Sequence, residues 1–142
     1  IDIIWQTGKT YTENISEQLK ERHFEVVRIG IEAPREVIYE RINHRVDKML
    51  ADGLVNEVKS LLPFRNLMSL RTVGYSELFR FFDDEWTLDF AVEEIKKNSR
   101  RFAKRQLTWY RKETDIHWVN FENSVQESLS LLSKLNIKPK NQ

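Results

Sequence analysis

The sequence predicts an α/β chain that is mainly α-helical, with two or three short strands. Apolar residues recur at helical spacing over 37–50 and again over 88–110. Only 24–31 and 116–119 have the β-branched and aromatic enrichment typical of strands. Because two isolated strands do not form a stable sheet, they are either edge pieces of a helical domain or members of a sheet whose other strands lie outside this chain.

Glycine and proline divide the first half of the chain. Residues 1–6 are apolar-rich and stop before Gly8, so they are expected to be the tail of a helix or strand. Pro34 suits the first turn of a helix, because its fixed φ and missing N–H are tolerated there. The dipeptide Asp52-Gly53 ends that helix.

The second half is predicted to be largely helical. In order, the expected elements are a helix over 54–62, a loop over 63–69, a helix over 73–82, a long helix over 88–112, a strand over 116–119, a helix over 124–135 and a frayed tail over 138–142. Leu78, Phe79 and Phe82 should point inward. Thr87 and Ser124 can each cap the helix that follows by accepting an early backbone N–H.

Length and composition favour one domain over 1–142, since 142 residues with 40% hydrophobic side chains can supply a core. The chain has no Cys, which excludes disulfides and Cys-based zinc sites, and its three His show no metal-ligand spacing. No apolar run approaches the roughly 18 residues of a membrane span, and no signal peptide opens the chain. We therefore expect a cytoplasmic protein.

The most informative segment is 100–111, which holds five cations and three aromatic residues in twelve positions. At about 100° per residue, a helix turns cations to one side and rings to the other. The basic side comprises Lys97, Arg101, Lys104, Arg105, Thr108, Arg111 and Lys112, and the packing side comprises Ile95, Phe102, Trp109 and Tyr110. The basic side is either generically solvated or directed at a polyanion, and the interleaved rings favour nucleic acid.

A second cationic pair lies on the helix that follows Pro34. Arg41 and Arg45 are four positions apart and therefore share one helix face. Two guanidiniums on one face can clamp a pyrophosphate or a backbone phosphate. The alternative, which the residues alone favour, is a solvated face in which Glu40 and Asp47 pair with these arginines.

Residues 71–76 join a loop to a helix and leave two interpretations equally open. Arg71, the hydroxyls, a flexible glycine and Tyr75 can together meet a phosphate or stack a base. The same residues can instead form a plain helix cap with a buried tyrosine ring.

Gln106 and 7–10 complete the candidates. Gln106 lies within the apolar side of the long helix, so its amide either satisfies nearby backbone or faces a functional cleft. Thr7-Gly8-Lys9-Thr10 resembles the end of a phosphate-binding loop, but Ile3 stands where that loop needs its first glycine. A helix stop at Gly8 accounts better for this segment. The residues alone therefore indicate a basic helical module, with RNA binding as a candidate function.

Three stretches in this order resemble the C-terminal half of the tRNA dimethylallyltransferase, or tRNA isopentenyltransferase, family. They are 41–58 (RINHRVDKMLADGLVNEV), 71–78 (RTVGYSEL) and 100–111 (RRFAKRQLTWYR). Thr7-Gly8-Lys9 also resembles a Thr-Gly-Lys that the family carries downstream of its phosphate loop. Ser76 departs from the pattern, because relatives often carry Lys or Arg there.

The resemblance implies an enzyme that transfers a dimethylallyl group from its diphosphate to N6 of the adenine beside a tRNA anticodon. It implies a nucleotide-binding (ATP-binding) P-loop NTPase-like fold, Mg²⁺ in the intact enzyme, and strands that belong to a parallel sheet. Arg41 and Arg45 become candidates for holding the diphosphate. The implied tRNA-binding residues are Arg71, Thr72, Val73, Gly74, Tyr75, Ser76, Lys104, Arg105, Gln106, Leu107, Thr108, Trp109, Tyr110 and Arg111.

The family's glycine-rich loop, catalytic Asp and magnesium ligands are expected upstream of this sequence. We therefore expect a C-terminal fragment of a larger enzyme that is inactive alone. The partners implied are a tRNA anticodon stem-loop and dimethylallyl diphosphate, without a membrane. Two alternatives from other classes are a non-catalytic RNA-binding helical module and a helical scaffold that binds proteins through exposed sheet edges.

Overall fold

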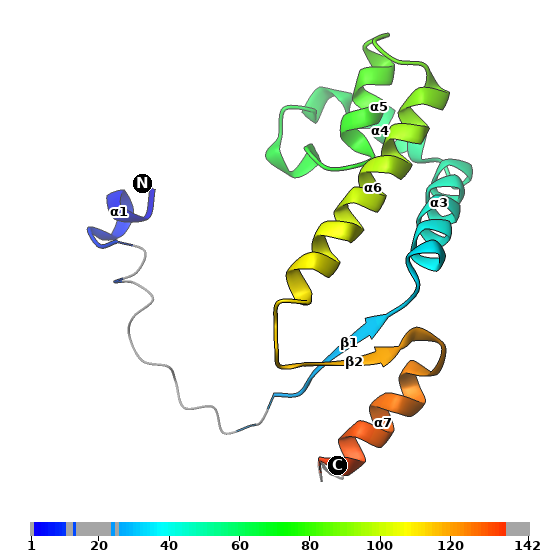
Figure 1. The fold of residues 1–142 in the computed structure, drawn as a ribbon. Coiled ribbons are helices and arrows are strands. Elements are labelled where there is room, and N and C mark those ends of the chain that lie inside the picture. The colour runs from blue at the N-terminus through cyan, green and yellow to red at the C-terminus, as the bar shows by residue number, and fades with distance from the viewer. Residues whose placement is uncertain (1, 11–12, 14–23, 25, 136–142) are drawn as a thin grey trace, which may run out of the picture.

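The computed structural model describes residues 2–10, 13, 24 and 26–135. Its helices and strands, in order, are α1 (Asp2–Thr7), β1 (Arg28–Glu32), α3 (Arg35–Ala51), α4 (Leu54–Ser60), α5 (Tyr75–Phe82), α6 (Leu88–Tyr110), β2 (Ile116–Asn120) and α7 (Ser124–Lys134) (Figure 1). Single turns of 3₁₀ helix lie at Leu62–Phe64, Met68–Leu70 and Phe121–Asn123. The mainly helical prediction is confirmed, while the tail expected over 138–142 lies outside the described residues.

The two predicted strands pair with each other in parallel. Arg28 is opposite Ile116 and Glu32 is opposite Asn120, so their carboxyl ends meet at one edge. The first strand begins at Arg28, later than predicted from sequence, and runs through Glu32. In the part of the chain that the structure describes, these strands form a two-stranded sheet.

Local sequence signals account for most helix ends. Gly8 has φ +69° and donates its N–H to the Ile4 carbonyl at 2.8 Å, which confirms the helix stop. Gly53 has φ +103° between α3 and α4, a conformation that favours glycine. The hydroxyl of Thr87 accepts the Phe90 N–H at 3.3 Å and caps α6.

Two boundary predictions need correction. Ser124 is the first residue of α7, and Asn123 holds the cap position without a side-chain cap bond. The loop expected over 63–69 contains parts of two 3₁₀ turns, because its backbone N–H groups bond to carbonyls three residues earlier, as Phe64 does to Leu61.

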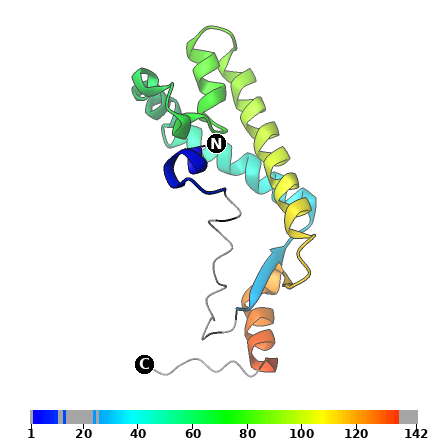
Figure 2. The same cartoon turned by 90° about the vertical axis from the view of Figure 1, so that its left-hand side faces the viewer.

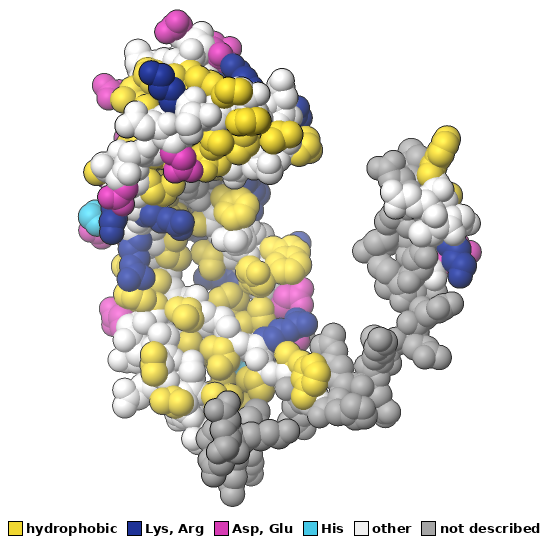
Figure 3. All heavy atoms as spheres, turned by 180° about the vertical axis from the view of Figure 1, so that it is seen from behind, with side chains coloured by type: hydrophobic (Ala, Val, Ile, Leu, Met, Phe, Trp, Pro, Cys, Tyr) yellow, Lys and Arg dark blue, Asp and Glu magenta, His cyan; other side chains and the backbone are white. Residues whose placement is uncertain are grey.

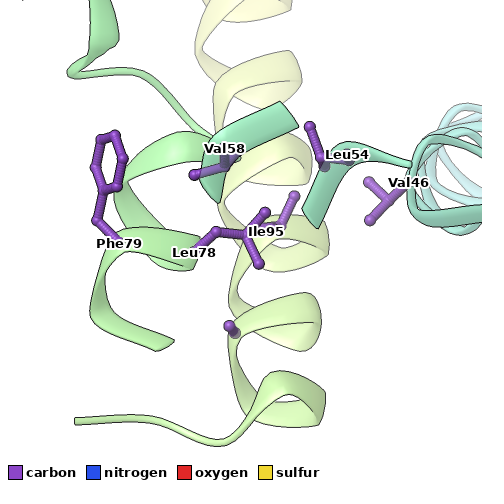
Figure 4. Packing of buried hydrophobic residues seen from close by; sticks show 7 residues of the cluster. Val46, Leu54, Val58, Leu78, Phe79 and Ile95 are labelled. Carbon is purple, nitrogen blue, oxygen red and sulfur yellow. The ribbon is translucent and has the colours of Figure 1, made fainter. Parts of the chain in front are cut away.

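The hydrophobic core joins α3, α4, α5 and α6. Its buried side chains are Val46, Leu54, Val58, Leu78, Phe79, Ala91 and Ile95 (Figure 4). Leu78 and Phe79 point inward as predicted, and Phe82 packs on this cluster while partly buried. From this cluster α6 runs to the sheet, and α7 packs beside β2 at that end (Figures 1 and 2). The second half of α6 is thereby carried away from the core.

No helix among the described residues is long and apolar enough to cross a membrane.

Candidate nucleic-acid interface

The carboxyl-terminal half of α6 forms a cationic groove. We use this name for the surface lined by Arg101, Lys104, Arg105, Thr108, Trp109 and Lys112. All of these side chains are exposed. The Thr108 hydroxyl donates to the Lys104 carbonyl at 2.9 Å, so this short side chain folds onto the helix and leaves room between the cations.

The acids of the described residues leave most of this groove unneutralised. Among those residues, Arg101, Lys104 and Arg105 form no ion pair, and Arg105 instead lies over the Phe102 ring at 5.6 Å. Arg111 at the end of the helix is 3.9 Å from Glu32, a distance at which two exposed groups interact weakly. Several cations therefore remain available to an external anion.

The prediction that the aromatic side of α6 packs is wrong for its second half. Phe102, Trp109 and Tyr110 keep 50%, 59% and 43% of their surface exposed. Only Ala91 and Ile95 of this helix are buried, because the core ends before the helix does. Trp109 lies edge-on to Tyr110 with ring centroids 4.8 Å apart, and it lines the groove beside the cations.

Hydrophobic and cationic side chains are consequently interspersed on the surface between the helical end and the sheet end (Figure 3). A flat ring next to lysines and arginines is suited to stack on a base while the cations contact the sugar–phosphate chain.

Gln106 faces a cleft. Of the two alternatives for its amide, a bond to nearby backbone or a position on a cleft, the structure shows the second. A cavity of about 540 Å³ lies between α6 and the two strands. Gln106, Ala103, Leu107 and Tyr110 line it from the helix. The strand side is apolar apart from Arg28 and comprises Ile29, Gly30, Ile31, Ile116 and Trp118, with Ile38 from α3.

The segment 71–76 was interpreted from the sequence either as a contact for a phosphate or base, or as a plain helix cap with a buried tyrosine ring. The structure has features of both. Arg71, Thr72, Val73 and Ser76 are exposed. Gly74, at φ +103°, donates its N–H to Glu77 at 2.8 Å, so this amide serves the helix cap and is not free for a phosphate.

Tyr75 in the same segment is half-buried and donates its hydroxyl to the Glu57 carboxylate of α4. This hydrogen bond, with smaller contributions from burial and the negative charge, raises the pKa of Tyr75 above its ordinary value. The ring is therefore held against the protein, while its neighbours at Arg71 to Val73 remain open to a ligand.

Arg41 and Arg45 lie exposed on α3, the helix that follows β1. Arg41 stacks over the ring of Phe121, which directly follows β2, at 4.6 Å. Neither arginine forms an ion pair within the described ranges, so the expected pairing with Glu40 and Asp47 is wrong. Ligands of open parallel sheets bind outside the carboxyl ends of strands, and the Arg41 guanidinium lies there, over Phe121.

Asp47 is instead engaged by α6. Lys96 contacts it at 2.7 Å, and the hydrogen bond raises the pKa of Lys96, partly opposed by burial. One turn further along α6, Arg100 donates to Asn43 at 2.6 Å. These contacts fix α3 against α6.

A third contact joins α6 to α5, where Asn98 donates to Glu77 at 2.8 Å. Sequence reasoning missed all three contacts. The available signal was a run of polar residues, 96–98 and 100, directly after the buried Ile95. One helix thus supports both the Arg41/Arg45 pair and the 71–76 segment.

Comparison with known proteins gives consistent results. The IPP transferase family model matches residues 1–113. tRNA dimethylallyltransferase 1 of Bacteroides thetaiotaomicron is 47% identical over 126 residues, covering 89% of this chain and 41% of the relative. tRNA dimethylallyltransferase of Christiangramia forsetii is 46% identical over 137 residues, covering 96% of this chain and 45% of the relative.

A solved structure has the same fold over the shared region. The full-length tRNA isopentenylpyrophosphate transferase of Bacillus halodurans superposes with a TM-score of 0.73 at 36% identity, covering 82% of this chain and 41% of that one. The chain therefore spans less than half the length of the curated relatives it matches here.

Proposed function

We propose, from the premise that this chain belongs to the IPP transferase family, that it is part of a tRNA-modifying prenyltransferase. The intact enzyme would transfer dimethylallyl from its diphosphate to N6 of the adenine beside the anticodon. The sequence resemblance that predicted this family is confirmed. A non-catalytic RNA-binding module is not favoured, because the relatives are transferases by name.

The cationic groove and the exposed part of 71–76 would hold the anticodon stem-loop. Contacts from Lys104 and Arg105 to phosphates supply affinity without reading sequence. Trp109, more than half exposed, provides a surface for stacking on an unpaired base. An adenine that reacts at its exocyclic amine must leave the base stack, so a protein that grips the flanking strand assists the reaction.

Arg41 and Arg45 would hold the diphosphate leaving group. Negative charge develops on the diphosphate as its bond to the dimethylallyl carbon breaks, and fixed guanidiniums lower the free energy of that state. Within the described residues neither arginine forms an ion pair, and Arg41 lies beside the carboxyl edge of the sheet, over Phe121. Both observations support this role.

Magnesium, the P-loop NTPase-like core and a cytoplasmic location are also parts of the proposal. Among the described residues, no group of three or more His, Cys, Asp or Glu can hold a metal ion, so no step is assigned to Mg²⁺ here. The chain contains no glycine-rich Gly-x-x-x-x-Gly-Lys-Ser/Thr loop. We propose that 1–142 contributes part of one catalytic domain.

The unneutralised groove on α6 is the observation that carries this proposal. The test is binding of a labelled tRNA anticodon stem-loop across a series of salt concentrations. Log affinity should fall linearly with log salt, with a slope of about −0.7 to −0.9 per phosphate contacted. The 142-residue chain should give no prenylated RNA with dimethylallyl diphosphate, whereas a protein of the relatives' length carrying this sequence should. Salt-independent or absent binding would refute the proposal.

A further inference from the structure

Glu77 is the one charged residue that is buried in the described part of the chain, with 5% of its surface exposed. Each of its carboxylate oxygens has its own partner. Oε2 accepts the Gly74 backbone N–H, and Oε1 accepts the Asn98 side-chain amide, both at 2.8 Å. Burying a carboxylate costs free energy that such hydrogen bonds offset, so both contacts are needed for this arrangement.

The two partners belong to the two separate parts of the proposed RNA surface. Gly74 is inside the 71–76 segment, and its φ of +103° sets the direction in which the chain enters α5. Asn98 is in α6, the helix that carries the cationic groove. Glu77 therefore links the 71–76 segment directly to α6, and the structure shows no other side-chain hydrogen bond between these two described segments.

Asn98 lies on the same side of α6 as the groove. Arg105 follows it by seven positions, which returns a helix to within about 20° of the same direction, roughly 10 Å further along. Trp109 follows Arg105 by four positions and continues this line. The segment that Glu77 holds at Asn98 is thus aligned with the groove rather than placed on another face.

We propose that Glu77 is a positioning residue that locks 71–76 in line with the cationic groove, so that a single RNA strand contacts both. This inference rests on the proposed function and adds a device to it. Glu77 itself is buried and touches no substrate, so it acts through Gly74 and Asn98.

Tyr75 supports the same conclusion from the other side of the segment. Its hydroxyl bonds to Glu57 of α4, which leaves Arg71 to Val73 as the free portion. A segment pinned at two adjacent residues presents its exposed side chains in one orientation, and it avoids the entropy loss of ordering them upon binding.

The experiment uses Asn98→Asp, alone and combined with Glu77→Gln, in the whole chain. The single change sets two carboxylates against each other and removes the donor that Oε1 needs. The double change restores complementarity, because the new amide donates to the new carboxylate while its oxygen still accepts the Gly74 N–H. Binding of the labelled anticodon stem-loop should weaken about tenfold in the single variant and return to within about twofold in the double variant.

A coupling measurement separates positioning from a general loss of stability. Arg71→Ala should weaken binding in the parent and have little further effect in the Asn98→Asp background, because the segment is no longer aligned. Arg105→Ala should weaken binding equally in both backgrounds, since its place on α6 is unchanged. Hydrogen exchange at the Gly74 amide should accelerate in the single variant and slow again in the double variant.

Unchanged binding by Asn98→Asp, or an Arg71→Ala effect of the same size in both backgrounds, would overturn this inference while the proposed function stands. Failure of the double variant to recover binding, although it recovers Gly74 protection, would also overturn it. If the parent chain itself shows no salt-sensitive RNA binding, the proposed function fails, and this inference fails with it.

Discussion

Arg100 of α6 donates a hydrogen bond to the side-chain oxygen of Asn43 on α3, across 2.6 Å and 57 positions of sequence. Asn43 lies between Arg41 and Arg45, so this contact is made by the same helix segment that carries the proposed diphosphate-holding pair. The orientation of that pair is therefore coupled to the helix that carries the cationic groove.

Replacing Arg100 by Met should lower the free energy of unfolding by about 1–3 kcal/mol, because a half-buried hydrogen bond to a charged group is lost. Urea denaturation measures this change. Arg101→Met is the matched control, since it removes an equal charge from the next position, where the structure shows no ion pair. The control should stay within about 0.5 kcal/mol of the parent. Equal effects would mean that the Asn43 contact does not stabilise the fold.

The parallel strand pair depends on a close approach at Gly30. A Cβ added there would lie 2.8 Å from the Ile116 methyl Cγ2 and 2.8 Å from the Trp118 ring. Gly30→Val should therefore destabilise the chain by about 1–3 kcal/mol through overpacking, despite the high strand propensity of valine. Thermal unfolding monitored by Trp fluorescence checks this.

Ile31→Val provides the comparison for Gly30, because Ile31 is the next strand residue and is 59% exposed. It should change stability little. A stable Gly30→Val variant would mean that β1 and β2 can separate without cost.

The features that sequence predicted correctly are those fixed by neighbours in the chain. Thr87 caps α6 with a bond to a backbone N–H three residues away, and Gly53 separates two helices through its own φ. The Glu77–Asn98 bond spans 21 positions and depends on how α5 packs on α6, which no local pattern encodes.

Trp109 was assigned to the wrong side of α6 from the sequence. It follows Arg105 by four positions, about 40° around the helix, so helical spacing itself places the ring beside the cations, where it lines the groove. The sequence predicted the cationic groove and the Arg41/Arg45 pair as candidate sites. It did not predict that α6 carries the groove and also holds α3 in place through the contacts to Asp47 and Asn43.

The Tyr75–Glu57 contact predicts a stability difference at alkaline pH. Its hydrogen bond raises the folded pKa of Tyr75 above the unfolded value near 10, so the contribution is fully present below that value. It is lost as pH rises through the folded pKa. Parent and Tyr75→Phe should therefore differ in unfolding free energy at pH 7 and converge above about pH 10.

Urea titrations at several pH values measure the convergence for Tyr75. Glu57→Gln keeps an acceptor but removes the charge, so it should lower the spectrophotometric pKa of Tyr75. A Tyr75 that titrates at its ordinary value in the parent would contradict the contact.

The cationic groove should determine the salt dependence of RNA binding. Lys104→Ala and Arg105→Ala should each weaken stem-loop binding and reduce the log–log salt slope by about 0.7 to 0.9, the contribution of one phosphate contact. Fluorescence anisotropy at four or more salt concentrations gives both quantities. Lys134→Ala on α7 removes the same charge outside the groove and should preserve the slope. A slope that changes equally in all three variants would point to net charge instead of the groove.

Arg45 distinguishes leaving-group stabilisation from RNA binding. In a protein of the relatives' length, Arg45→Ala should lower kcat by about 10²-fold, because a donor aimed at developing charge contributes mainly in the transition state. The tRNA dissociation constant should change by no more than about twofold, since Arg45 is on α3 and is not among the residues that line the groove. Lys48→Ala, which removes an exposed cation one turn further along α3, should leave both quantities unchanged.

Single-turnover kinetics measures the chemical step of the Arg45 variant, and fluorescence anisotropy measures its tRNA dissociation constant. A larger fall in tRNA affinity than in kcat would make Arg45 an RNA contact.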